Sequence, residues 1–193
     1  MEVPSAADDG AAKSNKKKSK TKIPFVYDVV SILISAIFTI VVIFTFFFRF
    51  AGVVGPSMQP TLYENDWLIV DTAESSYKTG DIIISTQPNA FNEPIVKRVI
   101  ATGGQTLEID FSTGKVTVDG VELDESEYIR GSTIDSEGFS GSVTVPEGKL
   151  FVMGDNREHS TDSRSDLIGM LDERYIIGKV KMRFLPRDSI RFF

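Results

Sequence analysis

The stretch "PIVKRVIAT", residues 94–102, is a run of isoleucine and valine that contains a lysine, Lys97. Such a short run of β-branched residues favours a strand. Side chains alternate along a strand, so Lys97 shares a face with Ile95 and Val99. A lysine aligned with apolar side chains is unusual, because lysine is seldom fully buried. The pattern leaves two explanations open: a buried lysine with a special role, or a lysine at a strand edge whose amine reaches solvent.

Other apolar alternations predict further strands, and turn residues separate them. They are WLIVDT (67–72), DIIIST (81–86), TLEID (106–110), KVTVDG (115–120), KLFVMGD (149–155) and GKVKMRF (178–184). DFSTGK (110–115) and VDGVEL (118–123) are typical of hairpin turns. No helical periodicity of comparable strength follows residue 49. We therefore expect a mainly β domain, antiparallel, with barrel-like or sandwich packing. The polar residues 124–142 predict a long surface loop.

Residues 29–48, "VVSILISAIFTIVVIFTFFF", carry no charge. At about 1.5 Å per residue a helix of this length spans roughly 30 Å, the thickness of a membrane's hydrocarbon core. A buried core helix rarely runs this long without a polar stripe. A cleaved signal peptide has a shorter apolar region, and Arg49 occupies the −3 position before Ala51. We expect a retained transmembrane anchor over residues 25–49, with residues 29–48 as its core.

Residues 1–24 precede this anchor and contain a cluster of lysines: Lys13, Lys16, Lys17, Lys18, Lys20 and Lys22. Positive charge beside a membrane helix marks the cytoplasmic side. The expected topology is therefore a disordered cytoplasmic tail, a single span, and an extracytoplasmic domain over residues 50–193.

Composition excludes several classes of function. The chain has 21 basic and 27 acidic residues, and the lysine-rich tail leaves the outer domain more acidic still. Such a domain is a poor candidate for binding nucleic acid, which requires a basic face. The chain has no cysteine, which excludes disulfides, thiolate nucleophiles and zinc–thiolate sites. We expect no metal and no cofactor.

A serine lies close to the expected membrane boundary, in "VVGPSMQPTL", residues 53–62. Ser57 comes eight residues after Arg49, so it lies at most about 29 Å from that boundary. That height points to substrates that are themselves in the membrane. A serine nucleophile needs a base. The candidates are His159, the chain's single histidine, and Lys97 with a pKa lowered by burial.

Four motifs occur in one order: GPSMQPTL (55–62), GDIII (80–84), VKRVIATGG (96–104) and GDNREHSTDSR (154–164). Together with the anchor, they resemble the bacterial type I signal peptidases, membrane-bound serine endopeptidases that remove signal peptides from exported preproteins. The resemblance implies a catalytic β domain of the signal-peptidase and repressor-peptidase type. It implies Ser57 as nucleophile and Lys97 as general base. Its partners would be signal peptides and the lipid bilayer of a bacterial cell membrane, with room for association with the protein-export machinery.

The same resemblance implies supporting roles for other residues. Ser160 would orient the lysine amine by a hydrogen bond. Arg98, Asp162 and Arg164 would form a salt-bridged group that holds the lysine strand against the last motif. Asp155 and Asn156 would serve local turn structure. Pockets for small side chains at substrate positions −1 and −3 would fall on residues that are also ordinary core candidates: Val53, Met58, Leu62, Ile95 and Val96.

The sequence departs from the family pattern at the oxyanion hole. Gly55 replaces a serine that some members have two residues before the nucleophile, which leaves a second donor beside the Ser57 N–H open. The sequence leaves two other interpretations open: an anchored Ser/Lys self-processing peptidase, related to the soluble repressor-type enzymes, and a non-catalytic anchored β scaffold. Labelling of Ser57 by an acylating inhibitor would exclude the scaffold.

Overall fold

The computed structural model describes residues 23–186 and 189–193. Its chain divides into two units, residues 1–40 and 41–193. The predicted tail, residues 1–24, lies outside the described residues except for its last two positions. Helix α1, Ile23–Phe47, contains a stretch, Phe25–Phe47, that is long and apolar enough to cross a membrane. Its apolar side chains are exposed, as the 67% exposed Ile32 illustrates, so α1 is not a buried core helix.

The apolar run and the helix end at different places. α1 ends at Phe47, and strand β1, Phe48–Gly52, begins at the next residue. β1 pairs antiparallel with β2, Trp67–Asp71, and Arg49 lies opposite Val70. The helix therefore ends two residues before the end of the predicted anchor, residues 25–49, because Phe48 and Arg49 pair with β2.

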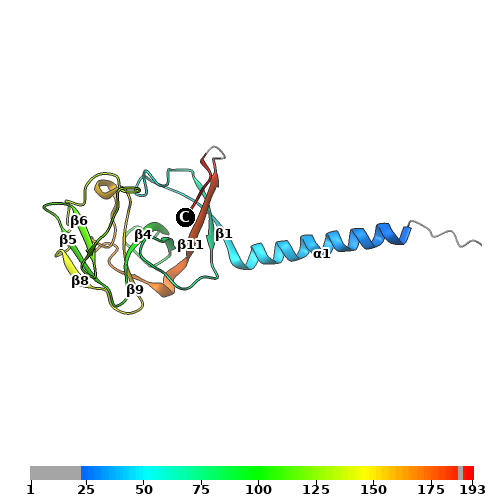
Figure 1. Cartoon of the computed structure of the whole chain (residues 1–193), viewed down its shortest axis with the longest axis horizontal. Coiled ribbons are helices and arrows are strands. Elements are labelled where there is room, and N and C mark those ends of the chain that lie inside the picture. The colour runs from blue at the N-terminus through cyan, green and yellow to red at the C-terminus, as the bar shows by residue number, and fades with distance from the viewer. Residues whose placement is uncertain (1–22, 187–188) are drawn as a thin grey trace, which may run out of the picture. The chain divides into compact units, whose positions relative to one another are not determined.

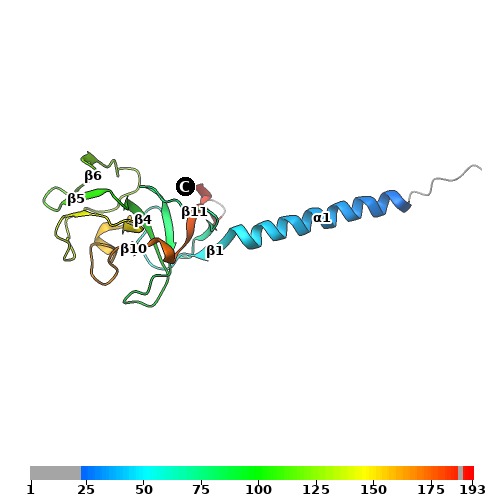
Figure 2. The same cartoon turned by 90° about the horizontal axis from the view of Figure 1, so that it is seen from below.

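The domain consists of two antiparallel sheets, which confirms the mainly β prediction (Figures 1 and 2). The larger sheet has the order β1-β2-β11-β3-β4-β9-β10, with β12 also paired to β11. Its remaining strands are β3 (Ile82–Ser85), β4 (Ile95–Thr102), β9 (Lys149–Met153), β10 (Leu171–Asp172), β11 (Ile176–Leu185) and β12 (Arg191–Phe192). The smaller sheet has the order β7-β6-β5-β8, formed by β5 (Thr106–Asp110), β6 (Lys115–Val118), β7 (Val121–Glu122) and β8 (Ser142–Thr144). In both views β4 lies between the smaller sheet and β1 with β11.

Every predicted strand is present, and the short β1, β7, β8, β10 and β12 were not predicted. Both predicted hairpins form: β5 and β6 are joined by residues 111–114, and β6 and β7 by Asp119 and Gly120. Asp119 and Gly120 both have positive φ, at 50° and 79°, which is the backbone of a tight two-residue hairpin turn.

Three apolar clusters form the core, and the central strands are buried on both faces. In β3, Ile82 and Ile84 pack into one cluster while Ile83 packs into another. The same alternation places Ile95 and Val99 of β4 against the cluster of Ile83, and Val96 against the other. This is why β3 appears in the sequence as a continuous apolar run, and why β4 has apolar residues on both of its faces, rather than a simple apolar–polar alternation.

The predicted surface loop is only partly on the surface. Ser142 belongs to β8, and within residues 124–141 the side chains of Glu125 and Thr133 are buried. The cause is tertiary: the guanidinium of the buried Arg157 donates hydrogen bonds to both side chains. A polar, Gly/Ser-rich composition does not reveal such a partner.

Gly178 of β11 tests the packing of the larger sheet. A Cβ at this position would lie 2.1 Å from the carbonyl oxygen of Asp71, a backbone atom of β2. We expect Gly178→Ala to lower the free energy of unfolding by about 3 kcal/mol. Gly52→Ala, whose Cβ would meet nothing within 4 Å, should change it by less than about 0.5 kcal/mol. Urea unfolding of the detergent-solubilised chain, followed by Trp67 fluorescence, measures both, and equal stability of the two variants would contradict this description.

Candidate active site

Ser57 lies on a turn between β1 and β2 that apolar side chains hold in place. Its neighbour Met58 is 1% exposed and Leu62 is fully buried, and both pack into the cluster around Ile82. The Leu62 N–H donates to the Met58 carbonyl at 2.8 Å, which closes one helical turn immediately after the serine. Ser57 itself is half-buried. The turn is therefore anchored by its buried residues while the hydroxyl stays accessible.

Lys97 is buried in β4, at 4% exposed. Its Nζ donates to the Ser160 hydroxyl at 3.1 Å, and that hydroxyl donates to Oδ2 of Asp162 at 2.8 Å. Burial lowers the pKa of Lys97 to about 8, and the neighbouring Asp162 carboxylate opposes the lowering. A substantial fraction of the amine is therefore neutral near pH 8, with Ser160 holding its orientation.

The predicted supporting residues form two separate ion pairs rather than one group. Arg164 donates from Nε to Oδ1 and from Nη2 to Oδ2 of Asp162, both at 2.9 Å. Arg98 instead makes a two-pronged contact with Asp155, from Nε to Oδ1 at 2.8 Å and from Nη2 to Oδ2 at 2.7 Å. Asp155 also accepts a hydrogen bond from Thr61, on the turn that carries Ser57.

Asp155 is a residue whose role sequence reasoning missed. We interpreted it as a turn residue, but its buried carboxylate links β4, the last motif and the nucleophile turn. Arg98 and Asp155 lie 57 positions apart in the chain. No local pattern connects residues at that separation, and only the pairing of β4 with β9 brings them together.

Gly154 allows the last motif to approach the nucleophile turn closely. A Cβ on this glycine would lie 2.2 Å from Oγ of Ser160 and 2.5 Å from the carbonyl oxygen of Ser57. The next residues use this proximity: Asn156 donates its N–H to the Ser57 carbonyl at 3.0 Å and its side-chain amide to the Pro56 carbonyl at 3.1 Å. Backbone contacts of this kind set the position of Ser57 relative to Ser160.

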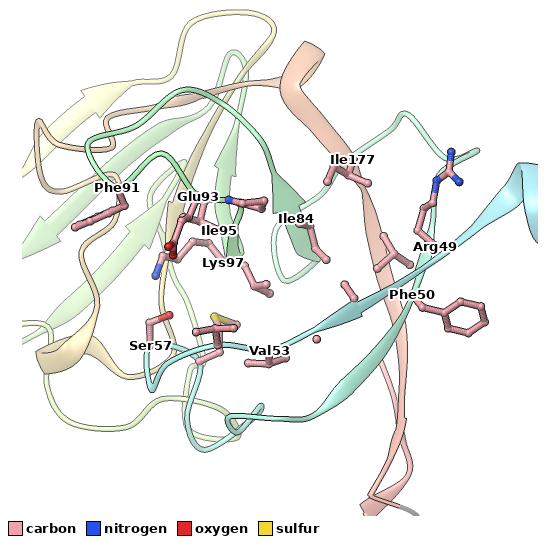
Figure 3. A pocket seen from close by; sticks show the side chains of 17 residues that line it. Arg49, Phe50, Val53, Ser57, Ile84, Phe91, Glu93, Ile95, Lys97 and Ile177 are labelled. Atoms are coloured by element: carbon pink, nitrogen blue, oxygen red, sulfur yellow. The ribbon is translucent and has the colours of Figure 1, made fainter.

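Ser57 and Lys97 line the same cavity, of about 680 Å³ (Figure 3). Their hydroxyl and amine point toward one another across it. Four of the predicted pocket residues also line it: Val53, Met58, Ile95 and Val96. Leu62 does not, because its side chain is fully enclosed in the core beneath the turn.

The cavity also contains residues that were not predicted. Phe91 and Glu93 lie on the segment before β4, and Ile84 and Ile177 lie on β3 and β11. Their positions depend on which strands neighbour β4, and no sequence signal identifies them. His159, the alternative base, is exposed on a short 3-10 turn, Arg157–His159, and does not line the cavity.

Comparison with known proteins gives consistent matches. Residues 26–185 match the family described as "Signal peptidase, peptidase S26". The chain is 32% identical over 184 residues to Signal peptidase I P of Bacillus subtilis subsp. natto, covering 90% of this chain and 97% of that protein. It is 33% identical over 186 residues to Signal peptidase I of Bacillus licheniformis, covering 91% and 97% respectively.

A solved structure, a signal peptidase I from Enterococcus faecalis V583, is 28% identical in sequence. It covers 54% of this chain and 96% of its own length, with a TM-score of 0.43. The family match and the two Bacillus relatives confirm the resemblance that the four ordered motifs indicate.

The buried lysine should reduce the stability of the fold at neutral pH. Unfolded Lys97 has its ordinary pKa of 10.5, and in the fold the pKa is about 8. Between these values the unfolded chain binds more protons, so stability rises with pH, and below pH 8 the penalty is fully present. We expect Lys97→Met to raise the free energy of unfolding at pH 7 by up to roughly 3 kcal/mol.

This gain should disappear as the pH approaches 10.5. Urea unfolding at several pH values measures it, with Lys78→Met, at an exposed lysine, as the control. A Lys97→Met gain that does not depend on pH would show that the amine is not the source of the penalty.

Proposed function

From the membership of this chain in the signal peptidase family, peptidase S26, we propose that it is a membrane-anchored serine endopeptidase that removes N-terminal signal peptides from exported preproteins. In this proposal Ser57 is the nucleophile and the neutral amine of Lys97 is the general base. The observation that carries it is the buried lysine whose amine faces Ser57 in one cavity and is held by Ser160.

The reaction follows from these positions. The Lys97 amine takes the proton of the Ser57 hydroxyl as its oxygen attacks the scissile carbonyl carbon. The ammonium then gives this proton to the leaving amine, the peptide C–N bond breaks, and an ester remains on Ser57. A water molecule, deprotonated by Lys97, hydrolyses that ester and restores the hydroxyl. The Ser57 backbone N–H is the donor that we assign to the negative oxygen of the tetrahedral intermediates.

The sheet leaves room for an extended substrate beside Lys97. On one side, β4 pairs with β3 from Ile95 to Arg98, but β9 pairs with β4 only from Arg98 onward. The other edge of residues 95–97 therefore faces the cavity. A peptide added as a strand along this edge would pass Ser57 with alternate side chains directed into the cavity.

Membrane anchoring explains why the substrate and the serine meet. β1, which follows α1 directly, contributes Arg49 to Gly52 to the cavity wall. In our proposal α1 spans the cell membrane with the N-terminus in the cytoplasm, and residues 50–193 lie outside it. Signal peptides are themselves apolar segments in the membrane, so enzyme and substrate are confined to the same surface.

We expect kcat/KM to rise between about pH 7 and 9. Lys97 must be neutral to act as a base, and its pKa is about 8, so the rate is low in acid and increases as the pH passes that value. Ser57→Ala and Lys97→Ala should each lower kcat by at least about 10³-fold, since the dyad acts as a unit. Ser160→Ala should reduce the rate markedly without abolishing it.

Processing of a preprotein by detergent-solubilised enzyme measures these rates, with His159→Ala as the control that keeps most activity. If the rate of a Lys97 variant still rose with pH around 6.5, Lys97 would not be the general base.

Cleavage should require small residues at positions −1 and −3 of the substrate. Apolar pockets lined by Val53, Met58, Ile95 and Val96 accept a methyl group and exclude larger side chains by overlap. Replacing alanine at −1 by leucine should lower kcat/KM by roughly 100-fold or more. Paired preprotein substrates that differ only at −1 provide the measurement, and efficient cleavage after leucine or lysine would contradict these pockets.

A further inference from the structure

The segment between β7 and β8, residues 124–141 and here called the strap, lies across the motif that holds Ser160. Its first half is attached through backbone and side chains. The Arg130 N–H donates to the Asp155 carbonyl at 2.7 Å, and the Arg157 N–H donates back to the Arg130 carbonyl at 3.0 Å. The Tyr128 ring lies 4.0 Å from the guanidinium of Arg98. The first half of the strap is therefore fixed to the domain by these contacts and is not a free loop.

The second half of the strap reaches Arg164, whose side chain is fully buried. Oε1 of Glu137 lies 3.2 Å from Nη2 of Arg164, and the Asp135 carbonyl accepts from Nη1 at 3.1 Å. Phe139 anchors this half, with its ring 5.1 Å from that of Phe151 in the core. The Glu137 carboxylate is therefore held against the Asp162–Arg164 pair. Asp162 accepts a hydrogen bond from Ser160, and Ser160 in turn accepts one from Lys97.

The backbone of Glu137 supports a role for its side chain. Its φ is +49°, in the left-handed region, which side chains other than glycine, asparagine and aspartate rarely adopt. Glycine would fit this position with less strain. A glutamate here is consistent with a requirement for the carboxylate itself.

When the charged groups near Lys97 are paired, the carboxylate of Glu137 remains as an extra negative charge. Each of the three buried arginines near the site has a carboxylate partner: Arg98 with Asp155, Arg157 with Glu125, and Arg164 with Asp162. These pairs are neutral, so they offer no net countercharge to an ammonium. Glu137 is the additional carboxylate in contact with these pairs, while the carboxylate of Asp135 on the same segment is exposed and therefore screened by solvent. Across the cavity, Glu93 is exposed, where solvent screens its charge.

We propose that Glu137 is a positioning residue that supplies the net negative charge against which the Lys97 ammonium forms during catalysis, an inference that rests on the proposed Ser57–Lys97 mechanism. It acts through Arg164 and Asp162, in contact with neither Ser57 nor the substrate. The strap thereby connects a segment outside the four motifs to the basicity of the catalytic amine.

The electrostatic directions agree with this role. The charges with the largest effect on Lys97 are those of Asp162, Glu137 and Asp155, which favour the ammonium, and Arg164, which disfavours it. Burial raises the pKa of Glu137, and Asp162 adds to that rise while Arg164 and Lys97 oppose it. Removing the charge of Glu137 should therefore lower the pKa of Lys97 further below its ordinary value.

The test compares Glu137→Gln, Glu137→Asp and Glu127→Gln in the full chain in detergent. Glutamine keeps the size and an acceptor for Arg164 but removes the charge, and aspartate keeps the charge. Glu127 is an exposed glutamate of the same strap and controls for the loss of any acidic residue there. For a preprotein substrate, the pH at which kcat/KM rises should be lower by about one pH unit in Glu137→Gln and unchanged in the other two variants.

At pH 6.5 a shift of this size raises the rate of Glu137→Gln, relative to its own plateau, by up to about tenfold. Its plateau kcat should fall severalfold, because a less basic amine removes the Ser57 proton less readily. A uniform loss of rate at all pH values with an unmoved limb would indicate a structural role only and would overturn the proposal. So would an equal shift in Glu127→Gln, or an unchanged profile in Glu137→Gln.

A second measurement does not depend on activity. In the Ser57→Ala chain, NMR titration of ¹³C-labelled lysine side chains gives the pKa of Lys97, assigned by its loss in Lys97→Met. Addition of Glu137→Gln should lower this pKa by about one unit. No change would overturn the role of Glu137. If the pKa of Lys97 fell but the pH–rate profile did not shift with it, the Ser57–Lys97 mechanism would be rejected instead.

Discussion

Burial of the Lys97 amine is the constraint on which the rest of the catalytic domain depends. A charged amine in an apolar strand is costly, and the cost lowers its pKa into the range where the neutral form is available. The surroundings limit this cost by pairing the arginines nearby with carboxylates at hydrogen-bond distance. Within residues 23–186 and 189–193, no buried side-chain nitrogen or oxygen lacks a hydrogen-bond partner. The lysine is thus buried in a network that is otherwise satisfied, which keeps its environment rigid.

The serine is positioned by a different kind of force. The buried side chains of Met58 and Leu62 anchor the turn in the core, and hydrogen bonds from Asn156 hold its backbone, which Gly154 allows to come close. Neither device requires a charged group at the serine itself. The hydroxyl and the amine are therefore held by different contacts, which meet at one cavity and are linked through Asp155. In the proposed mechanism, such prior placement removes the entropy cost of bringing the two reacting groups together.

The sequence predicted the strands well because their signals are local. Runs such as residues 82–85 and 149–153 are strongly apolar, and the Asp-Gly pair at 119–120, flanked by strand residues, is a strong local signal for a hairpin turn. The end of α1 was less predictable, since Phe48 continues the apolar run yet pairs with Asp71 of β2. The short strands β7, β10 and β12 contain too few residues for any periodicity to appear. Leu62 was assigned to a pocket, and it is a core residue because the turn carries it inward.

By itself the sequence determined the class of the domain, the apolar N-terminal helix and the motifs that contain Ser57, Lys97 and Ser160, because these depend on neighbouring residues. Only the tertiary structure decided which charges meet. It paired Arg98 with Asp155 and brought Glu137 to Arg164 from a segment whose composition indicates a plain surface loop. Ion pairs between residues far apart in the chain depend on the register of strands and the path of connections. Coulomb interactions depend on distance in space, so the spacing of these residues along the chain does not reveal which of them pair.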